Sequence, residues 1–314
     1  MAATPRRRAV LLMGPTGAGK SALAVRLAEE FPLEIVSADS ALVYRGMDIG
    51  TAKPDLETRR RVPHHLIDIR DPVMTYSTGD FLADAGAAME DIWRRGRQPL
   101  FAGGTMLYFH TLSAGIADLP DRDLVVRAAI DARAAQVGWP AVHEELAQVD
   151  PEAAARIHRN DPQRIQRALE VYQLTGQPIS VLQRARVSVL ADVDVLECVM
   201  SPSDRNILHA RIETRFSAML AAGFVDEVQR LRKRSDLNAE HPSMRAVGYR
   251  QIWRYLDARC TLAEAREQAI AATRQLAKRQ LTWLRARSRA TWFDSAHPDV
   301  ASMMLSALSE GEWY

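Results

Sequence analysis

The sequence predicts an α/β fold in which a parallel-sheet core carries an inserted all-helical subdomain and continues into a helical C-terminal region. Short apolar runs alternate with longer amphipathic stretches, which is typical of a parallel sheet covered by helices on both faces. Between about residues 120 and 183 the alternation stops, and the chain is helical in pattern and rich in Ala and Arg. Because this segment is too long for a plain crossover, it predicts an insertion.

The strands of the core are predicted from short apolar runs, most of which end at Gly, Ser or Pro. We expect them at 9–13, 34–36, 99–102, 196–200 and 291–293. The 3.6-residue spacing of apolar side chains predicts helices at 22–30, 81–95, 205–223, 225–234, 249–256 and 262–289, with a loop at 235–248. These elements assign 1–119 and 195–314 to the core and 120–194 to the insertion.

The composition is that of a globular chain, with 314 residues, 47% of them hydrophobic and 25% charged. It excludes a disordered, collagen-like or coiled-coil protein. The sequence contains no stretch of about 18 uncharged apolar residues, the length that a membrane-spanning helix needs. The apolar run at 9–13 is shorter than the core of about 7 residues that a signal peptide needs. The two cysteines, Cys198 and Cys260, form no metal-type cluster. We therefore expect a cytoplasmic protein without a membrane partner.

The charge is unevenly distributed along the chain. Residues 201–292 contain 18 Lys and Arg against 9 Asp and Glu, a local charge of +9. Because the whole chain has a formal charge of +2, the remainder carries −7. Such a basic third fits either a solvated surface or a polyanionic partner.

A phosphate-binding motif follows the first predicted strand. The segment Gly14-Pro15-Thr16-Gly17-Ala18-Gly19-Lys20-Ser21 matches GxxxxGK[ST] in full and leads into a predicted helix. In such a loop the backbone N–H groups and the helix N-terminus bind phosphate oxygens, and the lysine adds a cation. Ser21 is the expected Mg²⁺ ligand. The motif predicts a P-loop NTPase-like core that binds a di- or triphosphate.

The acid that an ATPase or GTPase carries at the end of a neighbouring strand is missing. The third predicted strand ends at Gly103-Gly104-Thr105. The carboxylate expected nearest the loop is Asp39, after the second strand, and ligands of such sheets bind outside the carboxyl ends of the strands. Asp39 is therefore expected to face the phosphate site, unless it only caps the segment that follows it.

Five further motifs follow along the chain. In order they are SADSALVYRGMDIGTAKP at 37–54, PHHLID at 63–68, GGTMLY at 103–108, NDPQRIQRALE at 160–170 and VGYRQ at 247–251. Together they resemble the motifs of the tRNA dimethylallyltransferases, also called tRNA isopentenyltransferases. Eukaryotic members often append a zinc finger. Since this chain shows none, it resembles the bacterial form.

The resemblance implies transfer of a dimethylallyl group from dimethylallyl diphosphate to N6 of adenosine 37, next to the anticodon of tRNA. The products would be N6-isopentenyladenosine and diphosphate. Lys20 and the rest of 14–21 would neutralise the leaving group, and Asp39 would accept the N6 proton of the flipped base. Thr105 would hydrogen-bond the base, or only cap a helix. The expected cofactor is Mg²⁺, the partner is the tRNA anticodon stem-loop, and the protein is expected to be a monomer.

The insertion is expected to contribute basic and amide side chains to tRNA binding. Arg164 and Arg167 lie one turn apart on a helix that starts after Asp161-Pro162, although a solvated helix surface is the alternative. Arg127 is expected to contact a backbone phosphate. The full set expected to bind tRNA is Asp39, Ser40, Ala41, Leu42, Thr105, Arg127, Gln163, Arg164, Ile165, Gln166, Arg167, Arg245, Arg274 and Lys278.

The last predicted helix has an apolar face beside a basic stripe, as a helix that docks on an RNA backbone would have. The apolar face is formed by Ile270, Ala277, Leu281 and Leu284, and the basic stripe by Arg274, Lys278, Arg285 and Arg289. Binding through such a stripe should fall steeply with salt. Arg211 and Arg215 lie at i and i+4 earlier in the basic third. One of them, Arg215 in preference, is expected to reach the diphosphate.

Two other functions stay open from the sequence. A small-molecule kinase of the shikimate or adenylate type shares the loop and the sheet, but leaves the basic third and the missing strand-end acid unexplained. A phosphate-loop RNA-binding protein without catalysis is the second alternative. The motif also allows ATP to compete for the loop.

Overall fold

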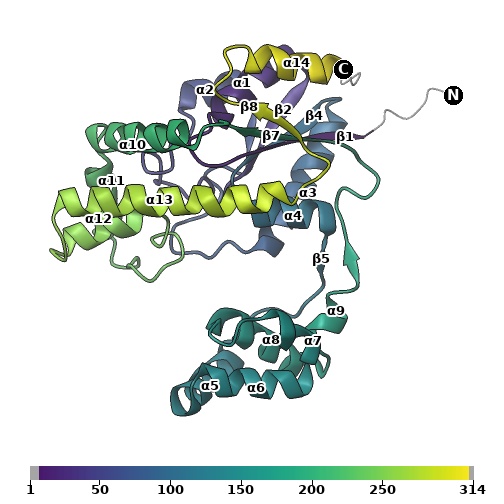
Figure 1. Ribbon diagram of the computed structural model, residues 1–314, viewed down its shortest axis with the longest axis vertical. Helices are drawn as coiled ribbons and strands as arrows, with labels where there is room; N and C mark the ends of the chain where they lie inside the picture. The colour runs from purple at the N-terminus through teal and green to yellow at the C-terminus, as the bar shows by residue number, and fades with distance from the viewer. Residues whose placement is uncertain (1–6, 311–314) are drawn as a thin grey trace. The chain divides into compact units, whose positions relative to one another are not determined.

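A computed structural model of the chain describes residues 7–310, which form two compact units (Figure 1). The larger unit joins the chain up to Leu112 with the chain from Asp192 onward, and the smaller is Ser113–Ala191. The smaller unit begins before the predicted position 120 because it includes a short strand, β5 (Ile116–Ala117). The extreme ends of the predicted core, 1–6 and 311–314, lie outside the described residues.

The larger unit contains a six-stranded sheet in the order β3-β2-β4-β1-β7-β8, and all neighbouring strands are parallel. The five predicted strands are confirmed with small changes at their ends: β1 (Arg8–Met13), β2 (Leu33–Ala38), β4 (Gln98–Gly103), β7 (Asp194–Ser201) and β8 (Thr291–Asp294). The sequence does not predict β3 (His64–His65), because two histidines carry no apolar pattern. β1 and β2 are buried almost throughout, as expected of strands covered on both faces.

Helices pack on both faces of this sheet (Figure 1). On one face α1 (Lys20–Glu30) lies beside α14 (Val300–Glu310), and both contribute to one apolar core with β1. On the other face α3 (Thr78–Arg94) contacts β2 and β4. α3 begins at a capping box between Ser77 and Asp80. Three helices are not expected from the sequence pattern: α14, α2 (Leu56–Arg61) and α4 (Met106–Ala114).

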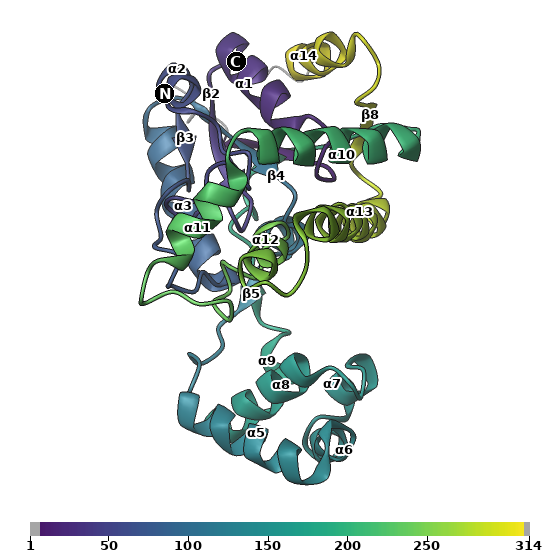
Figure 2. The same ribbon diagram turned by 90° about the vertical axis from the view of Figure 1, so that its left-hand side faces the viewer.

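The basic third forms a helical layer with its own apolar core. It consists of α10 (Arg205–Ala221), α11 (Phe224–Arg232), α12 (Tyr249–Leu256) and α13 (Leu262–Arg285), close to the predicted limits. Figure 2 shows α13 almost end-on, with α10 and α12 beside it. α13 ends four residues earlier than predicted, with Ala286 as its C-cap residue. Among residues 7–310, no helix combines the length and the apolar character needed to cross a membrane.

The smaller unit is helical, as predicted, and has a separate apolar core. Its helices are α5 (Leu124–Val137), α6 (Trp139–Val149), α7 (Pro151–Arg156), α8 (Pro162–Thr175) and α9 (Ile179–Leu182). The structure adds a two-stranded antiparallel ribbon, in which β5 pairs with β6 (Arg186–Val187). Asp161 caps α8 by accepting a hydrogen bond from the Arg164 N–H, and Pro162 follows at the first helical position.

Candidate functional site

The phosphate loop lies between β1 and α1, and its glycines explain its path. Gly17 and Gly19 have φ angles of +83° and +91°, in the left-handed region that favours glycine. A Cβ on Gly14 would lie 2.2 Å from the carbonyl oxygen of Met200, so only glycine allows this approach to β7. α1 starts at Lys20 with Gly19 as its N-cap residue and without a side-chain cap. Its first N–H groups are therefore suited to an anion.

Two half-buried cations face one carboxylate beside this loop. Burial lowers the pKa of Lys20 to about 8, although the charge of Asp39 opposes the shift, and Arg215 adds to it. Burial likewise lowers the pKa of Arg215, again against the effect of Asp39. The Lys20 ammonium donates to the carbonyl oxygen of Pro15 at 2.8 Å. Because the residues that line the pocket carry more positive than negative charge, it favours an anionic ligand.

Asp39 and Thr105 follow the carboxyl ends of β2 and β4, which are neighbouring strands. Asp39 Oδ1 accepts a hydrogen bond from the Ala41 N–H at 2.9 Å, so this oxygen does stabilise the following turn. Its Oδ2 has no hydrogen-bonding partner in the described part of the chain. Thr105 Oγ1 accepts from the Ser40 N–H at 3.0 Å and therefore fixes the backbone next to Asp39. Thr105 links the two strand ends.

A cavity of about 550 Å³ lies in front of these groups, within the size range of small-molecule sites. Ten of the residues predicted for the site line it: Thr16, Lys20, Ser21, Asp39, Ser40, Ala41, Leu42, Thr105, Arg215 and Arg245. The choice between the two arginines of α10 falls on Arg215. Arg211 instead donates to Ser295 Oγ and to the Ser295 carbonyl oxygen, at 3.0 and 3.1 Å.

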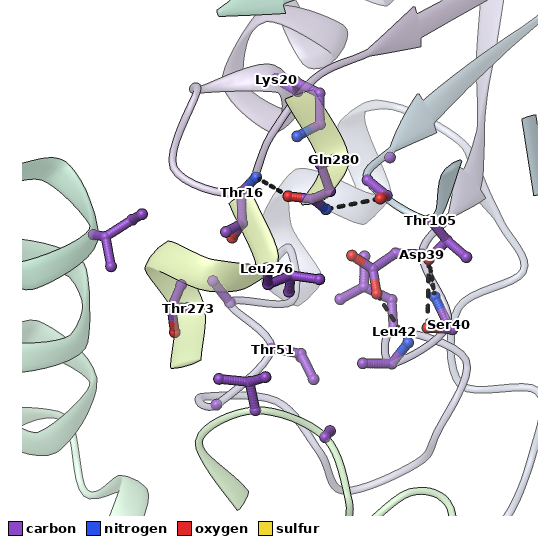
Figure 3. Close-up of a pocket in the computed structure, with 18 of the residues that line it drawn as sticks. Thr16, Lys20, Asp39, Ser40, Leu42, Thr51, Thr105, Thr273, Leu276 and Gln280 are labelled. Atoms are coloured by element: carbon purple, nitrogen blue, oxygen red, sulfur yellow. Dashed lines mark hydrogen bonds between the residues drawn. The ribbon is translucent and has the colours of Figure 1, made fainter. Parts of the chain in front are cut away.

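The structure adds pocket residues from α13 that the sequence analysis did not select. Gln280 Oε1 accepts from the Thr16 N–H at 2.9 Å, and its Nε2 donates to the Gly104 carbonyl oxygen at 2.7 Å. Figure 3 shows Gln280 between the phosphate loop and the strand end beside Thr105. Arg279 and Trp283 also line the pocket. A polar residue on the inner face of an amphipathic helix was the available signal for Gln280.

The basic stripe of α13 is partly engaged in ion pairs. Arg274 donates to Glu213 of α10 at 3.2 Å, whereas Lys278 and Arg285 are exposed. Ile270, Ala277 and Leu284 are buried as predicted, and Leu281 is half-buried against the same core. The amphipathic pattern is confirmed for the helix, but Arg289 of the predicted stripe lies beyond the end of α13.

The predicted tRNA residues of the insertion fall into two groups. Gln163 and Arg164 are exposed. In contrast, Arg127 and Arg167 both form ion pairs with Glu170 at 2.8 Å. Gln166 donates to Asp131 Oδ1 at 2.6 Å.

Ile165 requires a correction, because its side chain is 0% exposed in the core of the smaller unit. The Ile165 side chain packs in this core and is not accessible for contact with tRNA.

The parallel sheet with its glycine loop defines the class of protein, a P-loop NTPase-like α/β protein whose anion pocket also holds a carboxylate. Comparison with known families is more specific, because the model of the family described as IPP transferase matches residues 42–287. This chain belongs to the IPP transferase family. It is 57% identical over 295 residues to a tRNA dimethylallyltransferase of Nitrosococcus oceani, covering 94% of each chain. It is 54% identical over 311 residues to one of Ralstonia nicotianae, covering 96% of each.

Solved structures agree with this assignment. The crystal structure of a tRNA isopentenylpyrophosphate transferase from Bacillus halodurans matches with a TM-score of 0.68 and 36% identity, over 98% of this chain and 100% of that chain. A eukaryotic dimethylallyltransferase acting on tRNA matches with a TM-score of 0.82 and 26% identity, over 98% of this chain and 79% of that one. The resemblance noted in the sequence motifs is confirmed over nearly the whole chain.

Proposed function

We propose that this chain transfers the dimethylallyl group of dimethylallyl diphosphate to N6 of adenosine 37 in tRNA, forming N6-isopentenyladenosine and diphosphate. The observation that carries the proposal is a carboxylate, Asp39, in one pocket with the phosphate-loop lysine, while β4 ends without an acid. An ATPase or GTPase uses the strand-end acid to manage magnesium and water, whereas prenyl transfer needs a base for the nucleophile. Family membership supports the same reaction and does not favour a kinase.

The diphosphate leaving group needs a cationic environment and the carbon that it leaves needs a dry one, and the pocket offers both environments. The bond between C1 of the prenyl group and the diphosphate oxygen breaks as N6 bonds to C1. The loop N–H groups, Lys20 and Arg215 are suited to stabilise the negative charge that grows on the diphosphate. The remaining wall includes apolar side chains, which would keep water from an allyl cation-like carbon. They are Leu42, Ile212, Phe216, Met219, Val247 and Leu276.

Asp39 is the proposed acceptor of the N6 proton. Its carboxylate lies in the pocket, and only Oδ1 is hydrogen-bonded to the turn. Oδ2 can therefore accept a proton from the adenine. Thr105 holds the Ser40 backbone and keeps Asp39 in place, and its hydroxyl is also the proposed partner of the target base. The adenine must leave the stacked loop to reach this pocket, at a cost of a few kcal/mol.

Mg²⁺ is the proposed cofactor, and the donors present fit it. The Ser21 hydroxyl lines the pocket at the phosphate loop, and Asp39 is left free for its role as base. Mg²⁺ is commonly held by one or two protein oxygens, with substrate phosphates and water completing its shell. When bound, the ion would neutralise charge on the diphosphate.

We propose the anticodon stem-loop as the part of tRNA that is bound, by a monomeric enzyme in the cytoplasm. Exposed basic side chains in each unit support this proposal, Arg164 in the insertion and Lys278 and Arg285 on α13. Such groups bind a phosphate backbone without reading its sequence, so affinity should fall with salt. Whether ATP competes for the loop is testable in the same assay.

The test is incorporation of label from dimethylallyl diphosphate into unmodified tRNA without ATP. The Asp39→Asn variant should lose about 10² to 10⁴-fold in turnover, the range of a general base. Its tRNA affinity should stay within a few-fold, because the side chain keeps its size and its turn-forming oxygen. Asp226→Asn is the matched control, since Asp226 is an exposed aspartate outside the pocket.

Each outcome points to a different function. Unchanged turnover in Asp39→Asn would remove Asp39 from the base role. Tight tRNA binding by the wild type without incorporation would instead indicate a non-catalytic binding protein. Phosphorylation of a small acceptor that requires ATP would indicate a kinase.

A further inference from the structure

One wall of the pocket is a short loop held by a buried carboxylate outside the pocket. Gly50, Thr51 and Ala52 line the cavity. The carboxylate belongs to Glu227 in the first turn of α11, whose side chain does not line the pocket and is 2% exposed. The reaction as described above gives Glu227 no role.

Four neutral donors surround the Glu227 carboxylate. Oε2 accepts from the backbone N–H groups of Asp48 and Ile49 at 3.0 and 2.7 Å. Oε1 accepts from the Gly50 N–H at 3.1 Å and from the Tyr249 hydroxyl at 2.6 Å. Burial, with the nearby Glu227 charge, raises the pKa of Tyr249, so this hydroxyl stays a donor. Three consecutive backbone N–H groups of the loop are thus bound to one side chain.

The loop is also fixed by close packing and from its other end. A Cβ on Gly50 would lie 2.1 Å from the Phe224 ring and 2.6 Å from the Tyr249 ring, so the backbone lies directly against both rings. Lys53 donates to Asp48 Oδ1 at 2.6 Å and to the Tyr44 carbonyl oxygen at 2.8 Å. These contacts hold the loop in place against the helical layer.

The fixed loop in turn holds an arginine of the pocket. Arg215 donates to the Thr51 carbonyl oxygen at 3.1 Å. Arg215 is half-buried, lines the pocket, and interacts electrostatically with Asp39 and Lys20. A continuous set of hydrogen bonds therefore leads from Glu227 through the backbone of 48–51 to Arg215.

We propose that Glu227 is a positioning residue for the diphosphate: by binding the N–H groups of 48–50, it sets the Thr51 carbonyl that orients Arg215. This inference rests on the proposed transferase function. It gives Asp48-Ile49-Gly50 of the 37–54 motif a physical role, because three consecutive N–H groups could not converge on one carboxylate in an extended chain. Arg215 contacts the substrate in this scheme, and Glu227 acts only through it.

The first test compares Glu227→Gln with Asp226→Asn, a neighbouring exposed acid in the same helical turn. In either orientation an amide places its NH₂ against at least one loop N–H, where only an acceptor fits. We expect KM for dimethylallyl diphosphate to rise about tenfold or more, as misplacement of a positioning group does. KM for tRNA and the folded fraction should change little, and the control should behave as wild type.

A double-mutant cycle with Arg215→Ala separates this role from general structural damage. If Glu227 acts through Arg215, the double variant should bind diphosphate no more weakly than Arg215→Ala alone, because residues that act together are not additive. Additive losses, or an unchanged KM for dimethylallyl diphosphate in Glu227→Gln, would overturn the proposal.

Two further measurements keep the test decisive. Tyr249→Phe removes one donor to Glu227 and leaves the ring, so it should give a smaller rise of the same KM if Glu227→Gln fails to fold. The equilibrium affinity for inorganic diphosphate, measured without tRNA, reports whether Arg215 is correctly placed and does not require prenyl transfer. A weaker diphosphate affinity in Glu227→Gln would therefore support the positioning role even if the wild type transferred no prenyl group.

Discussion

Glu170 in the smaller unit and Glu227 in the larger unit are both buried carboxylates, yet they are stabilised in opposite ways. Glu170 is 0% exposed and accepts charged hydrogen bonds from Arg127 and Arg167 at 2.8 to 2.9 Å. Glu227 is surrounded by three backbone N–H groups and one tyrosine hydroxyl, all neutral.

The difference shows where each unit uses its cations. In the smaller unit two arginines neutralise an internal acid, so their charge largely serves folding. In the larger unit Arg95 pairs with the buried Glu34 at 2.7 Å, but neutral donors satisfy Glu227, and the half-buried cations Lys20 and Arg215 stay in the pocket. A partly buried cation without a full counter-charge is costly unless a ligand supplies that charge. The comparison therefore indicates which arginines are available for a phosphate.

The largest effect on stability is expected from Glu170→Gln. Removing one partner of a buried ion pair costs about 3–5 kcal/mol, because the other charges stay behind. Glu227→Gln should cost about 1–3 kcal/mol, the range for leaving buried hydrogen-bonding groups unsatisfied. Urea unfolding measures both, and hydrogen exchange of α5 and α8 assigns the Glu170 loss to the smaller unit. Glu144→Gln, an exposed position on α6, is the control. Equal losses in the two variants would contradict the comparison.

Acid should destabilise the smaller unit through the same residue. Burial acts to raise the pKa of Glu170, but hydrogen bonds from Arg127 and Arg167 prevail and lower it to about 2. A carboxyl whose folded pKa lies below its unfolded value of about 4.3 contributes stability above that value and loses it as the pH falls toward the folded pKa. By pH 3 the loss should be about 2 kcal/mol.

Hydrogen exchange of α8 between pH 6 and pH 3 checks this, after correction for the intrinsic rate. Glu170→Gln is the reference, since it lacks the titrating group and should not show this part of the pH dependence. The same dependence in both proteins would place its origin elsewhere.

The sequence predicts the parts of this site that local chemistry encodes. The phosphate loop is contiguous, and Asp39 follows from the end of a strand, so both could be found without knowing how the chain folds. The contacts of Gln280 and Glu227 could not be predicted in this way, because their partners Thr16 and Gly50 are far away in sequence and no local spacing joins them. Their roles exist only once α13 and α11 are packed.

The insertion shows a different limit of sequence reasoning. Arg164 and Arg167 look equivalent on a helical wheel, but only Arg167 has Glu170 three residues later on the same face. That spacing was a visible sign that Arg167 pairs within the helix. The burial of Glu170, which makes the pair structural, depends on Arg127 from another helix and could not be predicted from α8 alone.

The smallest effect, and the sharpest use of the comparison, is expected from these two arginines. The Arg164 side chain is 70% exposed, and its pair with Asp161 is a weak surface contact, so Arg164→Ala should leave stability almost unchanged. If it contacts a tRNA phosphate, affinity should fall a few-fold and the salt dependence should flatten by about one charge. Arg167→Ala, in contrast, should lower the free energy of unfolding, because it breaks the pair with Glu170. Titrations of tRNA at several salt concentrations, beside urea unfolding, distinguish the two. An Arg164→Ala variant with an unchanged salt slope would leave the exposed arginine of α8 without a role in tRNA binding, and the available cations would then be those of the larger unit.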